Sequence, residues 1–128
     1  EEMTIRFTML AGKIHRATVT DANLDYEGSI AVDPELLQSA GMPPYAQVQV
    51  YNITNGERFE TYTMSGERGS RQVVINGAAA HKASKGDLVI IALYVQVEKA
   101  RVPEHRPRLV YVDADNTITR IVREGSSG

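Results

Sequence analysis

Short stretches of alternating hydrophobic and polar residues recur along the chain, a pattern typical of half-buried β-strands. Residues that favour turns, mainly glycine, proline and asparagine, separate these stretches. One such turn is Asn55-Gly56, a hairpin signal whose usual conformation needs positive φ at both residues. The pattern therefore predicts a mostly β fold, with strands in residues 4–20, 46–54, 57–64, 71–75 and 87–98, and a last hairpin in 108–122.

Two further segments refine this prediction. The run 88–95, LVIIALYV, is apolar at both alternate sets of positions, which predicts a strand covered on both faces. Asp33 precedes the only well-marked helix as a capping residue, Pro34 suits its first position, and Gly41 can take the left-handed conformation that ends it. Many short strands with few short helices favour a closed or nearly closed barrel, because closure removes exposed strand edges.

Composition narrows the classes of protein. The 128 residues suit one domain, which buries roughly two-thirds of the surface of the unfolded chain. The net charge of −2 and the lack of a basic run predict no nucleic-acid partner. The longest apolar run is far shorter than the roughly 18 residues of a membrane span, and no secretory signal is visible, so we expect no membrane association. The absence of cysteine fits the cytoplasm, and residues 125–128, GSSG, resemble an appended tail.

Conventional motifs assign no chemistry. His15, His81 and His105 are widely separated and lack the paired spacing of a metal site, so we expect no metal. The glycine-containing strings lack the Gly-Lys-Ser/Thr of a phosphate loop, and Ser70 lacks the Gly-x-Ser-x-Gly of a nucleophile elbow. Single motifs therefore leave the function open.

Three longer strings together carry a resemblance. TMLAGKIHRATVTDANLDYEGS (8–29), NGERFETYTMSGERGS (55–70) and NGAAAHKASKGDLVIIALY (76–94) resemble the pyruvoyl-dependent L-aspartate α-decarboxylases of pantothenate biosynthesis, in order and spacing, over about residues 4–98. The resemblance implies a double-psi β-barrel and a homotetramer with active sites shared between neighbouring subunits. It implies L-aspartate as substrate and β-alanine as product, and some members need a separate protein that promotes maturation.

The resemblance gives the Gly28-Ser29 pair a chemical meaning. In this family the serine hydroxyl attacks the preceding carbonyl, the amide becomes an ester, and elimination and hydrolysis leave a pyruvoyl group. Residues 1–28 would become a β chain and 29–128 an α chain that begins with the pyruvoyl derived from Ser29. This group forms a Schiff base with the substrate and accepts the electrons released with carbon dioxide. Lacking a Cβ, Gly28 would permit the strained backbone and close approach that the attack needs.

The resemblance also implies roles for four side chains. Arg58 matches the arginine that binds the substrate carboxylate, for which a planar guanidinium is suited. Lys13 matches a second electrostatic contact to the substrate, Tyr62 the proton donor after decarboxylation, and Thr61 a residue that assists self-cleavage and contacts the substrate. Each has an ordinary structural alternative, such as a solvated charge or a residue that favours strands.

The remaining site positions line the expected pocket. The resemblance implies substrate contacts from Asn76, Gly77, Ala78, Ala79 and Ala80, the last four through backbone amides, and places His15, Tyr26 and Tyr51 at pocket positions. Asn-Gly is also a standard turn pair, and the three pocket residues could equally be structural.

Two alternatives stay open for the function of the chain: a non-catalytic β-barrel binding module in which Gly28-Ser29 is a turn, and an unprocessed precursor.

Overall fold

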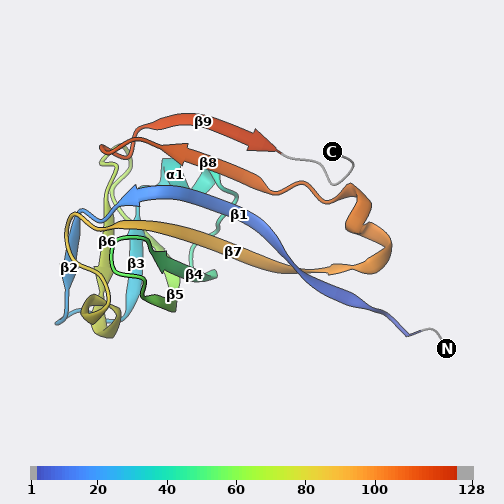
Figure 1. Cartoon of the computed structure of the whole chain (residues 1–128), viewed down its shortest axis with the longest axis horizontal. Coiled ribbons are helices and arrows are strands. Elements are labelled where there is room, and N and C mark those ends of the chain that lie inside the picture. The colour runs from blue at the N-terminus through green and yellow to red at the C-terminus, as the bar shows by residue number, and fades with distance from the viewer. Residues whose placement is uncertain (1–2, 124–128) are drawn as a thin grey trace.

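The computed structural model describes residues 3–123, so the expected tail at 125–128 lies outside the described residues. These residues form nine strands, one α-helix and two 3-10 helices (Figure 1). In chain order they are β1 (Arg6–Thr18), β2 (Asp21–Asn23), β3 (Ser29–Val32), α1 (Pro34–Ser39), β4 (Gln47–Asn52), β5 (Arg58–Ser65), β6 (Val73–Asn76), η1 (Gly77–His81), β7 (Leu88–Glu98), η2 (Lys99–Glu104), β8 (Arg108–Val112) and β9 (Ile118–Arg123).

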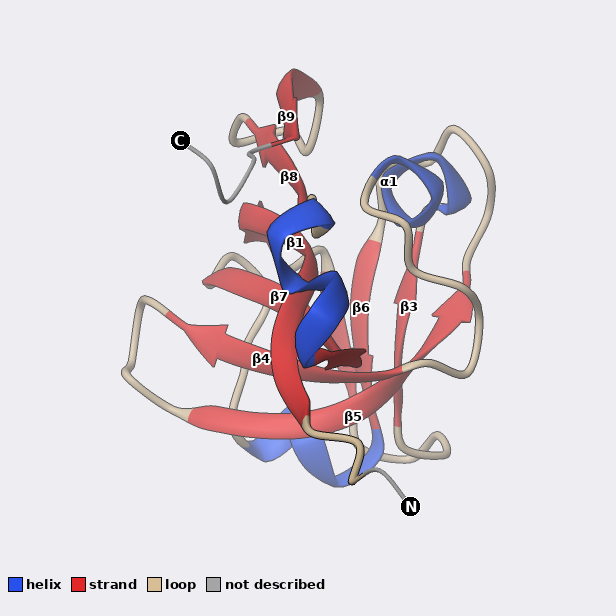
Figure 2. Cartoon of the chain, turned by 90° about the vertical axis from the view of Figure 1, so that its right-hand side faces the viewer, coloured by secondary structure: helices blue, strands red, loops and turns tan. Residues whose placement is uncertain are grey.

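The strands form one mixed sheet in the order β2-β6-β3-β5-β4-β7-β1-β8-β9. Pairs β1–β8, β2–β6 and β3–β5 are parallel, and the other neighbouring pairs are antiparallel. Figure 2 shows β3 to β6 curving around a common interior with α1 above it. Hydrogen bonds do not close the sheet, because β2 and β9 are its two edges. The mostly β fold with few short helices is confirmed, and its arrangement is consistent with a double-psi barrel.

The inward positions of the predicted strands build the core. Val48 and Val50 on β4 are fully buried, whereas Gln47 and Gln49, which alternate with them, are not. Aliphatic side chains from both halves of the sheet and from α1 complete the core: Ile14, Ile30, Val32, Leu36, Leu37, Val73, Ile75, Val89 and Ile91. Period-two alternation therefore identifies the core face of the sheet.

The apolar run on β7 is only partly covered. Val89 and Ile91 to Leu93 are buried, but Tyr94 and Val95 are 38% and 37% exposed. The predicted cover on both faces is therefore wrong for Tyr94 and Val95. The ladder between β4 and β7 ends at Leu93, and beyond it β7 continues with β1 as a two-stranded ribbon (Figure 1).

The hairpin between β4 and β5 is confirmed, but its turn differs from the prediction. Gly56 has φ of 78°, whereas Asn55 does not have positive φ. The Asn52 N–H donates to the Glu57 carbonyl at 2.8 Å, which encloses a four-residue loop. Inside it the Asn52 side-chain oxygen accepts the N–H groups of Thr54 and Asn55 at 2.9 and 3.3 Å. A four-residue loop needs only one left-handed residue, so glycine alone takes that conformation.

Helix α1 follows the predicted rules. The Asp33 carboxylate accepts the Glu35 N–H at 2.9 Å, Pro34 is the first helical residue, and Gly41 beyond the end has φ of 71°. Asp33 is 1% exposed and also accepts the N–H groups of Gly69 and Arg71, at 3.1 and 2.8 Å. Burial raises the pKa of Asp33, but these backbone hydrogen bonds outweigh it and hold the pKa below its usual value.

We expect Asp33→Asn to destabilise the fold by about 1–3 kcal/mol at neutral pH, because the amide NH₂ would face backbone donors. The low pKa of Asp33 makes its stabilisation complete above the ordinary carboxyl pKa and progressively lost as pH falls through the folded value. Urea unfolding of both proteins between pH 7 and pH 3 tests this. The two free energies of unfolding should converge towards low pH, and a difference that does not depend on pH would contradict the assignment.

Candidate active site

The Gly28–Ser29 bond lies where an exposed loop enters the sheet. Residues 24–28 are exposed, whereas Ser29 is the first residue of β3 and only 6% exposed. Ser29 pairs with Asn76, the last residue of β6. The bond between the two predicted cleavage residues is therefore held from one side by a strand ladder.

Asn76 makes the polar contact to the Ser29 side chain. Its Nδ2 donates to Ser29 Oγ at 3.3 Å, and the amide is almost fully buried. Its Oδ1 is also buried and has no hydrogen-bond partner among the described residues. An unsatisfied buried acceptor costs about 1–3 kcal/mol. Asn76 therefore presents one engaged donor and one free acceptor at the Ser29 hydroxyl.

Gly77 packs directly against Gly28, on one side of the predicted cleavage bond. Its φ is 74°, and a Cβ at this position would lie 2.6 Å from Gly28 Cα, 2.7 Å from Gly28 N and 3.0 Å from the Tyr26 carbonyl oxygen. Gly28 itself is not left-handed, and a Cβ there would meet only the Asn76 carbonyl oxygen, at 3.9 Å. The strain and close approach expected at Gly28 therefore lie at Gly77. Sequence reasoning considered only the Gly77 amide and missed this packing.

Thr61 and Tyr62 lie on β5, the strand parallel to β3. The ladder between these strands begins with Ile30 opposite Thr63. Thr61 and Tyr62 precede Thr63, so they lie towards the end of the sheet at which β3 begins. The Thr61 hydroxyl has no hydrogen-bond partner among residues 3–123. No hydrogen bond or ring contact of the described residues joins either residue to Ser29.

A hollow of about 310 Å³ opens beside Tyr62, lined by Gln47, Glu60, Thr61 and Tyr62. The Tyr62 ring is 36% exposed and stacks on Tyr45, with ring centroids 6.3 Å apart. Glu60 accepts from Gln47 Nε2 at 2.6 Å and Gln49 Nε2 at 2.9 Å. The Tyr62 hydroxyl therefore borders a space large enough for a small ligand.

Arg58 is the first residue of β5, and its side chain lies over the ring of Tyr51. The two residues pair across β4 and β5, and Arg58 Cζ is 3.9 Å from the Tyr51 ring centroid. The Tyr51 hydroxyl meets the Tyr94 hydroxyl at 2.9 Å. Burial raises the pKa of Tyr51, the hydrogen bond to Tyr94 raises it further, and the nearby Arg58 opposes both. Sequence reasoning missed Tyr94, because its strand pattern predicted only a covered strand.

Lys13 and His15 gather around Tyr111. The Lys13 ammonium is 5.9 Å from the Tyr111 ring centroid, and the His15 ring meets the same ring edge-on at 5.3 Å. His15 Nδ1 is buried and unpaired among the described residues. Burial lowers the pKa of His15 first, and the charges of Lys13 and Arg16 lower it further. His15 is therefore biased towards its neutral form.

The predicted residues thus fall into four groups: Ser29 with Gly28, Asn76 and Gly77; Thr61 with Tyr62 at the hollow; Arg58 with Tyr51; and Lys13 with His15. Within residues 3–123, no hydrogen bond or ring contact joins one group to another. The Tyr26 side chain is 65% exposed, and Ala78 to Ala80 follow Gly77 in η1. One chain therefore places Asn76 and Gly77 at the Gly28–Ser29 bond but leaves the two cationic groups separate from it.

Comparison with known proteins decides the family. The family model "Aspartate decarboxylase" matches residues 5–119. The chain belongs to the aspartate decarboxylase family. It is 56% identical to the aspartate 1-decarboxylase of Thioalkalivibrio sulfidiphilus over 93% of this chain and 92% of that protein. It is 53% identical to that of Halorhodospira halophila over 95% of each, and 56% identical to that of Neisseria meningitidis over 90% and 91%.

The match to the aspartate decarboxylase family includes every predicted site residue, from Lys13 to Ala80. It also extends past residue 98, where the sequence resemblance contributed little. The family resemblance is therefore confirmed, and it covers β8 and part of β9 as well.

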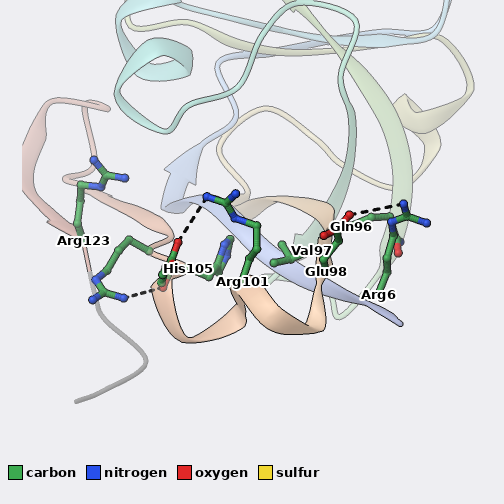
Figure 3. A pocket seen from close by; sticks show the side chains of 9 residues that line it. Arg6, Gln96, Val97, Glu98, Arg101, His105 and Arg123 are labelled. Carbon is green, nitrogen blue, oxygen red and sulfur yellow. Dashed lines mark hydrogen bonds and ion pairs between the residues drawn. The ribbon is translucent and has the colours of Figure 1, made fainter. Parts of the chain in front are cut away.

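A larger hollow lies away from these groups. About 580 Å³ in volume, it opens where the β1–β7 ribbon meets η2 and β9 (Figure 3). Arginines dominate its lining: Arg6, Arg101, Arg106 and Arg123. All four are exposed, and two of them approach carboxylates, Arg6 to Glu98 at 3.8 Å and Arg101 to Glu104 at 3.4 Å. The residues expected from the aspartate decarboxylase family do not line this hollow.

Across residues 3–123, no three His, Asp or Glu side chains gather closely enough to hold a metal ion. The helices in this range are too short to cross a membrane.

Proposed function

We propose that this chain is a self-processing, pyruvoyl-dependent decarboxylase that converts L-aspartate to β-alanine and carbon dioxide. The β-alanine would supply pantothenate synthesis in the cytoplasm. The observation that carries the proposal is the buried Ser29 hydroxyl, bonded to Asn76 and packed beside Gly77, in a chain of the aspartate decarboxylase family.

Self-cleavage would begin at Ser29. Its Oγ attacks the Gly28 carbonyl carbon, the C–N bond breaks, and the hydroxyl proton ends on the Ser29 nitrogen, which leaves an ester. Elimination then removes the proton from Ser29 Cα and breaks the Cβ–Oγ bond, which releases residues 1–28 with a carboxylate on Gly28. One water hydrolyses the remaining enamine and releases ammonia. Asn76 supports the first step because its donation to Oγ leaves the serine proton free to transfer.

The surroundings of Ser29 fit the resulting group. A pyruvoyl is no larger than the serine it replaces, and Asn76 offers a donor and a free buried acceptor at that position. When formed, it supplies a ketone conjugated to an amide, which captures the substrate amine and accepts the electrons released as carbon dioxide leaves. Asn76 would hold it, and the amides of residues 77–80 would border it.

The two fragments would stay together after cleavage. Residues 1–28 contain β1, which pairs with β7 from Arg6 opposite Glu98 to Thr18 opposite Leu88, and also with β8. Ile14 and Ala17 of β1 are fully buried in the core. The proposed β chain is therefore an integral strand of the sheet.

The remaining roles follow from the chemistry of the side chains. The Arg58 guanidinium would bind the side-chain carboxylate of aspartate in a bidentate manner, with Lys13 adding a second positive charge. Tyr62, which lines the hollow with Thr61, would donate its hydroxyl proton to the substrate carbon that has lost carbon dioxide. Thr61 would assist cleavage at the Gly28 carbonyl.

We propose that a second copy of the chain contributes residues to the site. Arg58 and Tyr62 are four residues apart on β5, about 13 Å between their Cα atoms at roughly 3.3 Å per residue, and the Arg58 guanidinium lies over Tyr51, the residue opposite it on β4. Only three bonds separate the amine of aspartate from its side-chain carboxyl carbon, so a substrate held at Tyr62 would reach Arg58 of the same chain only if the guanidinium left the Tyr51 ring. Arg58 and Lys13 of a neighbouring subunit would therefore complete the site, as in a homotetramer. Whether a maturation-promoting protein takes part stays a prediction.

Complementation between two inactive variants tests both function and sharing. The wild type should produce β-alanine and carbon dioxide from L-aspartate, whereas Ser29→Ala cannot form the pyruvoyl and Arg58→Ala cannot hold the carboxylate. Co-expressed with different tags and purified through both, the two variants should regain about a quarter of wild-type activity per site, because random mixing pairs an intact Ser29 with an intact Arg58 in that fraction of interfaces.

The outcomes distinguish the proposed activity from the proposed sharing of the site between subunits. A wild type without product would overturn the proposed activity and favour the non-catalytic binding module. An active wild type whose hybrid stays as inactive as its parents would instead place Arg58 in the same chain as the Ser29 it serves. The processed fraction of Arg58→Ala must match that of the wild type for the comparison to hold.

A further inference from the structure

Three neighbouring strands contribute one side chain each to a stack behind the proposed carboxylate-binding residue. Arg58 comes from β5, Tyr51 from β4 and Tyr94 from β7. Arg58 pairs with Tyr51 in the ladder, and its guanidinium carbon lies 3.9 Å from the Tyr51 ring centroid. The Tyr51 and Tyr94 hydroxyls meet at 2.9 Å. The contacts thus run from Tyr94 through Tyr51 to Arg58.

Arg58 depends on this stack for its orientation. Its side chain is exposed and pairs with no carboxylate among the described residues, so Tyr51 is the side chain that holds it. A free arginine side chain loses considerable rotamer freedom when it binds a ligand. Stacking on a fixed aromatic ring restricts that freedom in advance, and a pre-organised guanidinium binds a carboxylate more tightly.

Tyr94 in turn fixes the ring of Tyr51. Tyr51 lies on the outward face of β4, where its hydroxyl meets that of Tyr94 at 2.9 Å and also interacts with the Arg58 side chain. Tyr94 is anchored by its own backbone, which pairs with Leu10 of β1. The raised pKa of Tyr51 keeps its hydroxyl protonated at neutral pH, so either hydroxyl can serve as donor.

We propose that Tyr94 is a positioning residue for substrate binding: its hydroxyl holds the Tyr51 ring in the orientation on which Arg58 stacks. The inference rests on the proposed function, since it assigns Arg58 to the substrate carboxylate. Tyr94 itself touches neither substrate nor pyruvoyl in this account. Its effect should therefore fall on binding and leave the chemical step unchanged.

Tyr94→Phe keeps the ring and removes the hydroxyl. We expect KM for L-aspartate to rise about three- to tenfold, the equivalent of one net hydrogen bond, with kcat within about twofold of the wild type. Tyr51→Phe removes the other end of the same bond and should give a similar rise. The double variant should be no worse than either single variant, because both substitutions delete one interaction.

Thr8→Val is the matched control. It removes one hydroxyl from one exposed hydrogen bond to the same strand β7, that of Gln96 Nε2 to Thr8 Oγ1 at 2.7 Å. Its KM should equal that of the wild type, and intact mass should show equal processing in all variants.

Three results would overturn the inference: an unchanged KM in Tyr94→Phe with an active wild type, an equal rise in Thr8→Val, or additive effects in the double variant. A wild type without β-alanine production would overturn the proposed function and, with it, the role assigned to Tyr94. The two failures are therefore distinguishable by the activity of the wild type.

Discussion

Gly77→Ala is expected to leave the chain uncut between Gly28 and Ser29 and without decarboxylase activity. Gly77 has φ of 74°, a conformation that costs an L-residue about 1–2 kcal/mol. The added Cβ would also lie 2.6 Å from Gly28 Cα, a backbone atom that cannot rotate away. Relief of this clash must move Gly28 relative to Ser29, whose position is held by its pairing with Asn76. The Gly28 carbonyl would then leave the reach of the Ser29 hydroxyl.

Gly56→Ala provides the matched control for backbone strain. Gly56 has φ of 78°, almost the same as Gly77, but a Cβ there would meet nothing within 4 Å. Intact mass under denaturing conditions gives the uncut fraction of each variant, and circular dichroism checks that each is folded. We expect Gly56→Ala to be cut like the wild type. A folded Gly77→Ala that is cut as completely as Gly56→Ala would show that the contact with Gly28 does not control cleavage.

Tyr62→Phe is expected to lower kcat by about 10² to 10⁴, the usual contribution of a positioned proton donor. The substitution keeps the ring that stacks on Tyr45 and removes only the hydroxyl beside the hollow. Self-cleavage should proceed as in the wild type, because the attack requires the Ser29 hydroxyl and not that of Tyr62. Steady-state kinetics on fully processed protein separates kcat from KM.

Tyr45→Phe removes a hydroxyl from the other ring of the same stack. Tyr45 is 73% exposed and does not line the hollow, so its kcat should remain within about twofold of the wild type. Equal kcat values for Tyr62→Phe and the wild type would exclude Tyr62 as the proton donor. A parallel loss in Tyr45→Phe would point instead to disturbance of the stack.

Local sequence patterns predicted the elements well because their causes are local. The alternation of β4, the cap of α1 by Asp33 and the hairpin before β5 depend on residues close in sequence. The exposure of Tyr94 and Val95 did not follow from their apolar run, since it depends on where β4 stops pairing with β7. Whether a strand is buried is therefore decided by residues that are distant in the sequence.

The sequence patterns also failed to predict which polar residues are buried. Asn116 is 1% exposed and has φ of 61°; its side chain accepts the Thr18 N–H at 2.7 Å and donates to the carbonyls of Thr18 and Arg71, both at 2.9 Å. Asn52 likewise donates to the Lys82 carbonyl and to Asp87. Their partners are distant in the sequence, so turn propensity alone could not distinguish these residues from surface asparagines.

In the candidate site, too, some features were predicted from the sequence and others were not. The strings around Gly28, Arg58 and Asn76 predicted the family, whereas the roles of Thr61 and Tyr62 stay predictions. The tight packing of Gly77 on Gly28 did not follow from the sequence, because it joins the residue before β3 to the residue after β6. The separation of Arg58 from Ser29 within one chain likewise depends on register and not on spacing.

The intact mass of the freshly purified protein under denaturing conditions, with and without borohydride in the presence of L-aspartate, tests the central claim most directly. The account predicts two chains divided between Gly28 and Ser29, together heavier than the precursor by one water and lighter by one ammonia. The larger chain should gain a reduced adduct derived from aspartate. A single chain that remains uncut on warming and takes up no adduct would contradict the account.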